Sequence, residues 1–357
     1  MEAVTRLIAR SCFLGTLAAC GGGSDVGDAG DAKAPLDVAR LDAADAAEET
    51  APVPHLNLDT SSVTVSGISS GGFMAVQFHV AFSSIVKGAA VFAGGPYDCS
   101  KGSVSTALSS CAGGSPPPDV AASVTATNDN AQSGAIDPAS GLQDARIFLF
   151  VGADDNVVNP VVVDALQTYY ASFVPSASIA YVNRRPSTAH TWPTLDYGVP
   201  CDSVTPPYVG KCNYDGAGAA LAQLYGTLSP AATTLGGQFV PVPQDAFIAD
   251  PGSHSLDDTA YAYVPAACAS GDVCKVHVSF HGCLQGASSV GDAFYAHAGL
   301  DEWADTNHLV VLYPQAIKSG ANPEGCWDFW GYDSPDFAKK TGPQMAMVRA
   351  MIDGIAH

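Results

Sequence analysis

Basic residues are scarce in this chain. Its 357 residues include 15 Lys or Arg against 35 Asp or Glu, which gives a net charge of −20 and a pI near 4.4. Binding to nucleic acid needs a basic face that neutralises phosphates, so this composition argues against a nucleic-acid partner. The acidic character instead favours solubility and an uncharged or cationic substrate.

Several other patterns are missing. No two cysteines have the C-x-x-C spacing typical of zinc sites, and neither an internal repeat nor a second interdomain linker is visible after residue 55. We therefore expect neither a metal ion nor an organic cofactor. About 300 residues follow the N-terminal region, which is enough for one large α/β domain or two modest ones.

The first 20 residues have the pattern of an export signal. Arg6 and Arg10 precede a short apolar run, "SCFLGTLAAC", which is too short to span a bilayer. The ending Leu-Ala-Ala-Cys resembles a bacterial lipobox, and this predicts that Cys20 is lipidated. The alternative is an ordinary secretory signal cut nearby. Both interpretations predict an exported protein, extracellular or at the cell surface, and only the first gives it a membrane contact, through the lipid anchor.

Residues 21–54 are predicted to be a disordered acidic linker. The segment is rich in Ala, Asp, Gly and Pro and contains almost no aromatic residue, so it cannot bury enough apolar surface to offset its chain entropy. We expect it to tether a catalytic domain that comprises residues 55–357.

The remaining cysteines suggest disulfides. An even number of cysteines in an exported chain is typical of a disulfide framework: Cys99, Cys111, Cys201, Cys212, Cys268, Cys274, Cys283 and Cys326. Many pairings are possible from sequence alone. Local spacing favours joining each of the first six to its near neighbour, which leaves Cys283 to pair with Cys326.

Short apolar strands alternate with helical runs from about residue 55. Strands are predicted at residues 61–68, 88–94, 146–152, 178–183, 259–265, 275–282 and 309–315, and helices at 71–84, 157–173, 292–307 and 341–356. Near-continuous apolar strands mixed with helices predict a largely parallel sheet covered on both faces. Residues 111–140 are predicted to form a loop-rich insertion with some helix.

The stretch "GISSGG" lies between a predicted strand and a predicted helix and contains G-x-S-x-G, the nucleophile elbow. Only Ser69 has a glycine two residues before it and another two residues after it. Ser69 is therefore the candidate nucleophile, and Ser70 would supply its backbone N–H to developing negative charge. The alternative is a glycine-rich turn without chemistry, which the flanking strand and helix make less favourable.

A serine nucleophile needs a base and an orienting acid, which follow it in the order Ser, Asp or Glu, His in α/β-hydrolases. The strand at 146–152 ends in a loop with two aspartates, where the pattern G-x-x-D-x-x-V selects Asp155 over Asp154. His190 follows the next strand, beside Trp192, and is the candidate general base. The alternatives are a solvated loop acid and a structural histidine.

One motif is out of the usual order. The strand at 275–282 ends in His281-Gly282-Cys283, which resembles the H-G-G type of loop that supplies the second oxyanion N–H. In the usual hydrolase this strand precedes the nucleophile, whereas here it follows the candidate base. We interpret this as a circular permutation, which is tolerated because chain termini usually lie close together at the surface.

These motifs together resemble the single-domain extracellular poly(3-hydroxybutyrate) depolymerases, which have a circularly permuted α/β-hydrolase fold. The resemblance runs from about residue 58 to the end and rests on five stretches: "GISSGGFMAVQFHVAFS", "GADDNVVNP", "AHTWPT", "HGCLQG" and "NPEGCWDFWGY". It implies Ser69, Asp155 and His190 as a catalytic triad, an oxyanion hole from the N–H groups of Ser70 and Cys283, and a crevice for a single polyester chain.

The aromatic loop after Cys326 is a candidate substrate contact. A disulfide to Cys283 would hold this loop beside the oxyanion hole, and Trp327 or Trp330 is expected to lie against the apolar polyester. We expect no separate polymer-binding domain after the catalytic one, and this expectation favours amorphous polymer or soluble oligomers as substrates of a monomeric enzyme. The alternatives are a feruloyl or acetyl-xylan esterase and a surface protein that binds polymer without catalysis.

Overall fold

The computed structural model describes residues 53–356. The predicted signal segment with Cys20, and nearly all of the predicted linker at 21–54, lie outside the described residues. Among the helices of residues 53–356, none is both long and apolar enough to cross a bilayer.

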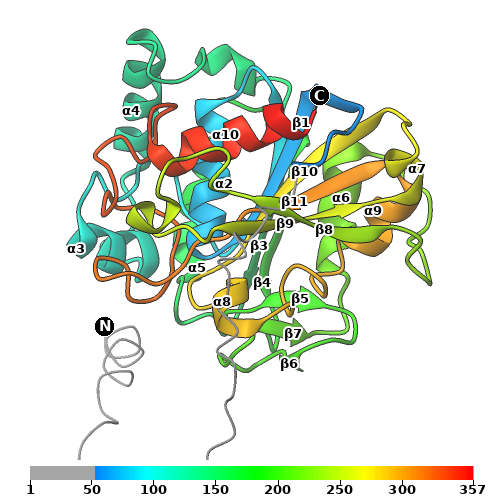
Figure 1. The fold of residues 1–357 in the computed structure, drawn as a ribbon. Helices are drawn as coiled ribbons and strands as arrows, with labels where there is room; N and C mark the ends of the chain where they lie inside the picture. The colour runs from blue at the N-terminus through cyan, green and yellow to red at the C-terminus, as the bar shows by residue number, and fades with distance from the viewer. Residues whose placement is uncertain (1–52, 357) are drawn as a thin grey trace, which may run out of the picture.

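An eight-stranded sheet forms the centre of the molecule, in the order β4-β3-β2-β1-β10-β11-β9-β8 (Figure 1). Its strands are β1 (Leu58–Ile68), β2 (Val86–Phe92), β3 (Arg146–Gly152), β4 (Ile179–Arg185), β8 (Gln238–Pro243), β9 (Thr259–Val264), β10 (Cys274–Phe280) and β11 (Leu309–Tyr313). The pairs from β4 to β11 are parallel, and β9 is antiparallel to both of its neighbours. The sheet is therefore largely parallel, as the sequence predicts.

The order of the strands shows the predicted permutation. The strands β1 to β4 fill one half of the sheet and β8 to β11 fill the other, so that β1 pairs with β10 at the centre. The strand that carries the H-G-C motif thus lies beside the elbow strand, although it comes more than 200 residues later in the chain. These observations confirm an α/β-hydrolase fold whose two halves are exchanged in sequence.

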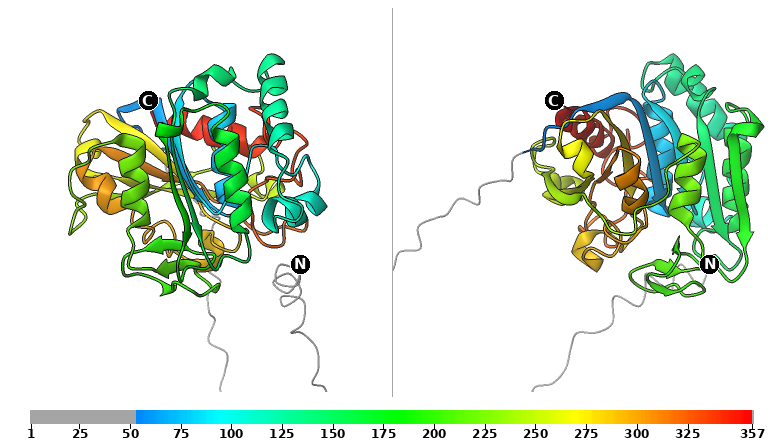
Figure 2. Two further views of the ribbon diagram at one scale, coloured as in Figure 1. Left: turned by 180° about the vertical axis from the view of Figure 1, so that it is seen from behind. Right: turned by 90° about the vertical axis from the view of Figure 1, so that its right-hand side faces the viewer.

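Helices cover both faces of the sheet (Figures 1 and 2). The longer ones are α2 (Ser70–Ala81), α4 (Val120–Gln132), α5 (Pro160–Tyr170), α6 (Gly216–Tyr225) and α10 (Pro343–Ile355), and the short ones are α3 (Val104–Thr106), α7 (Ala266–Ala269), α8 (Ala287–Val290) and α9 (Asp301–Thr306). A second, three-stranded sheet contains β5 (Trp192–Thr194), β7 (Val209–Lys211) and β6 (Val199–Pro200).

Successive strand residues point into two different apolar cores. In β3, Leu149 belongs to the core under α2, α5 and α10, whereas Phe148 and Phe150 belong to the core under α6 and α9. This alternation follows from the pleat of a strand, which sends successive side chains to opposite faces. Because both faces are buried, the strands are apolar almost throughout, and this is the pattern from which the sheet was predicted.

The predicted helix at 292–307 is wrong over most of its length. The chain forms turns there and becomes helical only in α9. Gly299 adopts a positive φ of 80°, which a right-handed helix cannot contain, so the apolar periodicity of the segment does not correspond to one continuous helix.

Candidate active site

Ser69 occupies a strained turn between β1 and α2. Its φ of 58° and ψ of −126° lie in a region that non-glycine residues rarely adopt. A Cβ on Gly67 would lie 2.1 Å from the carbonyl oxygen of Gly71, and a Cβ on Gly71 would lie 2.2 Å from that of Phe280. Both glycines of the G-x-S-x-G pattern are therefore required by close backbone approaches, one of them to strand β10.

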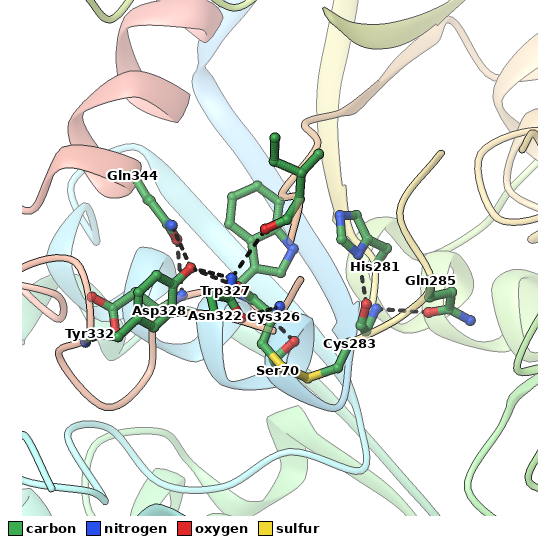
Figure 3. The surroundings of a disulfide bond; sticks show 12 residues. Ser70, His281, Cys283, Gln285, Asn322, Cys326, Trp327, Asp328, Tyr332 and Gln344 are labelled. Carbon is green, nitrogen blue, oxygen red and sulfur yellow. Dashed lines mark hydrogen bonds between the residues drawn. A yellow bond between two sulfur atoms is a disulfide. The ribbon is translucent and has the colours of Figure 1, made fainter. Parts of the chain in front are cut away.

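Ser70 begins helix α2, and its buried side chain has a separate structural contact. Its Oγ accepts a hydrogen bond of 3.3 Å from the backbone N–H of Trp327 (Figure 3). Within residues 53–356, the backbone N–H groups of Ser70 and Cys283 donate no hydrogen bond to a protein atom. Both donors thus remain available to a reacting group.

The candidate acid and base are joined directly. Oδ2 of Asp155 accepts a hydrogen bond of 2.9 Å from Nδ1 of His190, while Oδ1 accepts from the N–H groups of Val157 and Val158. Both side chains are buried, with exposures of 4% and 6%, whereas Asp154 is exposed. Because a carboxylate can only accept, the proton of the neutral imidazole lies on Nδ1 and the lone pair on Nε2.

A close backbone contact brings the two loops together. A Cβ on Gly152, the last residue of β3, would lie 2.1 Å from the carbonyl oxygen of Thr188. Ser69 and His190 line one cavity but make no hydrogen bond to each other within the described chain. Hydrogen bonds between nucleophile and base often shorten only when substrate binds.

The cavity has a volume of about 260 Å³ and a predominantly apolar wall. Apolar residues on its wall include Phe73, Val104, Leu108, Val157, Val158, Leu284, Phe329 and Trp330. They come from both halves of the chain, and Val104 and Leu108 are themselves exposed at the surface. An uncharged, largely apolar ligand fits such a wall.

The H-G-C loop lies against the serine. A Cβ on Gly282 would be 3.3 Å from Cβ of Ser69, and Cys283 lines the cavity. A disulfide joins Cys283 to Cys326 with their Cα atoms 4.2 Å apart (Figure 3). This bond ties the loop after β10 to the aromatic loop.

The two candidate tryptophans differ in position. Trp330 is partly exposed and lines the cavity, so a substrate contact stays a prediction for this residue. Trp327 is fully buried and packs against Phe280 and His281, with ring centroids 5.2 and 5.5 Å away. The prediction of a substrate contact is therefore wrong for Trp327, because its ring fills the core behind the cavity.

Sequence reasoning missed the residue that shapes the aromatic loop. Asp328 is buried, and its Oδ1 accepts from the N–H groups of Trp330, Gly331 and Tyr332. Its Oδ2 accepts from two further N–H groups of the same loop. A lone aspartate among aromatics gives no sign of this arrangement, which depends on the fold around it.

All four predicted disulfide pairings are confirmed. They join Cys99 to Cys111, Cys201 to Cys212, Cys268 to Cys274 and Cys283 to Cys326. Among residues 53–356, no group of three or more His, Cys, Asp or Glu is arranged to hold a metal ion.

Known proteins resemble this chain closely, although no family model matches it. A poly(3-hydroxybutyrate) depolymerase of Delftia acidovorans is 44% identical over 85% of the chain, which spans 61% of that relative's length. A polyhydroxybutyrate depolymerase of Talaromyces funiculosus is 38% identical, with 85% of this chain and 92% of that protein covered.

Two solved structures have the same fold. The crystal structure of PHB depolymerase from Penicillium funiculosum has a TM-score of 0.78 and is 38% identical, covering 86% of this chain and 99% of that one. A serine-to-alanine variant of a PHB depolymerase in complex with an R3HB trimer has the same TM-score and coverage at 37% identity. With this fold, and with such identity over nearly the whole of a relative, the chain belongs to the polyhydroxybutyrate depolymerase family.

Proposed function

We propose that this chain is an exported serine esterase that hydrolyses poly(3-hydroxybutyrate) or its oligomers. One observation supports this above all: the strained Ser69 shares an apolar cavity with a buried His190 that is hydrogen-bonded to Asp155. The names of the relatives, and the R3HB trimer in the solved variant, support the choice of substrate.

The proposed reaction begins when Oγ of Ser69 attacks an ester carbonyl while Nε2 of His190 takes its proton. The resulting oxyanion accepts hydrogen bonds from the backbone N–H groups of Ser70 and Cys283. As the intermediate collapses, His190 returns the proton to the departing alkoxide, which leaves as a hydroxyl chain end. Water, deprotonated by the same histidine, then releases the acyl group from Ser69.

The wall of the cavity favours a polyester over a sugar ester. A sugar presents many hydroxyl groups that need hydrogen-bond partners, and burial without them is costly. The predominantly apolar wall and the partly exposed Trp330 suit the methyl-bearing, uncharged backbone of polyhydroxybutyrate instead. A feruloyl or acetyl-xylan esterase is therefore the less favoured assignment.

Export is part of the proposal, and the four disulfides support it because such bonds persist in oxidising compartments. We further propose a lipid anchor at Cys20, a catalytic domain at 55–357 and a monomeric enzyme. Labelling cells with a palmitate analogue tests the anchor, since a freely secreted, unlabelled product would contradict it.

The central experiment incubates amorphous poly(3-hydroxybutyrate) with the purified protein and with its Ser69→Ala variant, and identifies soluble products by mass spectrometry. The wild type is expected to release hydroxybutyrate and short oligomers, and the variant to lose about 10⁴-fold or more in rate. Release at an undiminished rate by the variant would reject Ser69. Activity of the wild type on p-nitrophenyl butyrate without release from the polymer would keep the esterase and reject this substrate.

A further inference from the structure

His281 is a fully buried histidine immediately after β10, on the oxyanion side of the cavity. Its Nδ1 lies 2.7 Å from the carbonyl oxygen of Gly282, and its Nε2 lies 3.0 Å from the backbone nitrogen of Ala316 (Figure 3 shows the first bond). A carbonyl accepts and an amide donates, so the proton is on Nδ1 and the lone pair is on Nε2. Burial, which lowers the pKa of His281 to about 4, favours the same neutral ring.

The other polar group of Gly282 is also held. Its N–H donates a hydrogen bond of 2.7 Å to Oε1 of the buried Gln285 (Figure 3). Nε2 of Gln285 in turn donates to the carbonyl oxygens of Tyr208 and Pro207, at 2.9 and 3.2 Å. The carbonyl of Gly282 is thus held by the side chain of His281, and its N–H is held by the side chain of Gln285, which also reaches a distant loop.

The imidazole itself has little room to turn. A Cβ on Gly286 would lie 3.0 Å from Cε1 and Nε2 of the ring. The ring of Trp327 packs on another side, with the centroids 5.5 Å apart, and Phe294 lies at 6.5 Å. Trp327 therefore supports the position of this imidazole.

The direction of the Gly282 carbonyl decides where the next N–H points. In a trans peptide the C=O and the N–H of one unit point in opposite directions. The carbonyl of Gly282 is turned towards the ring of His281, so the N–H of Cys283 is turned away from it. Gly282 itself lies against Ser69, Cys283 lines the cavity, and its N–H has no acceptor among the described residues.

We propose that His281 is a positioning residue of the esterase: by holding the Gly282–Cys283 peptide, it aims the N–H of Cys283 at the oxyanion formed on Ser69. The inference rests on the proposed function, since it concerns the oxyanion hole of that same site. A hydrogen bond to the carbonyl also polarises the peptide and strengthens its N–H as a donor. His281 takes no proton during the reaction.

Two variants separate the two bonds of the ring. In His281→Asn the side-chain amide can reach the position of Nδ1 and still donate to Gly282. In His281→Gln the polar group extends to the position of Nε2. The side-chain donor to the Gly282 carbonyl is then lost, which leaves this carbonyl the 3.2 Å hydrogen bond from the backbone N–H of Gln285. His277→Asn is the matched control, because His277 is fully buried on the same strand but bonds only to Thr64 and Ser66.

The assay uses the whole protein and p-nitrophenyl butyrate, so that a failure on polymer does not affect it. His281→Gln is expected to lower kcat by about 10- to 100-fold at an unchanged KM, because an oxyanion contact acts only in the transition state. His281→Asn is expected to lose less. Affinity for a trifluoromethyl ketone, which forms an oxyanion on the serine, should fall by the same factor as kcat/KM.

A purely structural role predicts a different pattern. His281→Gln and His277→Asn would then both lose stability with kcat unchanged, and that result would overturn the proposal. If His281→Gln does not fold, Gln285→Leu removes the other anchor of Gly282, and it is expected to lower kcat and ketone affinity together. An undiminished kcat in that variant would equally overturn the proposal. If instead the Ser69→Ala variant kept the wild-type kcat on the same ester, the proposed function itself would be rejected.

Discussion

The two sides of the cavity are built on different principles. On the acid–base side, Asp155 and His190 follow the adjacent parallel strands β3 and β4 and meet through their own side chains. On the proposed oxyanion side, the expected donors are backbone N–H groups in segments that are held by contacts from distant parts of the chain. Ser70 binds the backbone of Trp327, 257 residues away, and Gln285 reaches Pro207, 78 residues away.

This difference separates what is visible in a sequence from what is not. A carboxylate and an imidazole at strand ends are side chains with a chemical signature, so they can be recognised one residue at a time. A backbone N–H belongs to every residue except proline, and its usefulness depends on how its peptide is aimed. In the proposed site, His281, Gln285 and the Cys283–Cys326 disulfide hold the Gly282–Cys283 segment, and none of them performs the chemistry.

Substitution of Asp155 is the most direct test of the acid–base side. Asp155→Asn is expected to lower kcat by about 10⁴-fold, because an amide can donate to His190 and stabilise the wrong tautomer. Asp154→Asn changes the exposed neighbour in the same way and is expected to retain wild-type kcat. Steady-state kinetics on p-nitrophenyl butyrate measure both, and equal losses in the two variants would undo the assignment of the acid.

The two tryptophans of the aromatic loop are expected to have different roles, Trp327 in stability and Trp330 in substrate binding. Trp327→Ala removes a fully buried ring and is expected to lower the free energy of unfolding by about 3–5 kcal/mol. Trp330→Ala is expected to leave stability nearly unchanged and to raise KM for oligomers about tenfold. Urea unfolding and oligomer kinetics on each variant test this, and a raised KM with intact stability for Trp327→Ala would reverse the assignment.

Two disulfides allow a comparison between the cavity and the rest of the molecule, because one lies beside the cavity and the other does not. By loop entropy, losing Cys283–Cys326, with a separation of 43 residues, is expected to cost about 4 kcal/mol of unfolding free energy, and losing Cys268–Cys274, with a separation of 6, about 2 kcal/mol.

Double cysteine-to-alanine variants, unfolded in urea and assayed below their transitions, provide the measurement. Of these two pairs, only loss of Cys283–Cys326 is expected to lower kcat as well, because Cys283 is the proposed oxyanion donor. An equal effect of both variants on kcat would mean that the disulfide beside the cavity contributes nothing specific to the site.

The most gradual effect concerns pH. Burial lowers the pKa of His277 to about 3, whereas the unfolded chain titrates near 6.5. Between these values the unfolded state binds a proton that the folded state does not, so stability falls as the pH falls below 6.5. The advantage of wild type over His277→Asn should shrink by about 1 kcal/mol per pH unit there. Urea unfolding from pH 7 to pH 4 measures this, and parallel curves for the two proteins would contradict it.

Much of the fold followed from the sequence because its signals are local. Gly67 is needed for a contact with Gly71 only four residues away, and short cysteine loops pair with their neighbours. The exchange of halves was visible because the H-G-C strand comes after the candidate base. Strand β8 was missed because Pro241 and Pro243 argue against a strand. Proline is tolerated there because β8 is at the edge of the sheet.

Other features depend on contacts that no local pattern contains. Gly299 interrupts the predicted helix at 292–307 through a backbone conformation that periodicity does not reveal. The burial of Trp327 depends on packing against Phe280 and His281. Asp328 and His281 both bind backbone groups, so the motifs that contain them did not reveal what either side chain contacts.

A structure of the protein after reaction with an alkyl phosphonate tests the account most directly, since the phosphonyl oxygen takes the place of the oxyanion. We expect phosphorus bonded to Oγ of Ser69, with that oxygen about 3 Å from the backbone nitrogens of both Ser70 and Cys283, and with His281 still bonded to Gly282. An adduct on another residue would contradict Ser69 as the nucleophile. A phosphonyl oxygen directed away from Cys283 would contradict the proposed oxyanion hole.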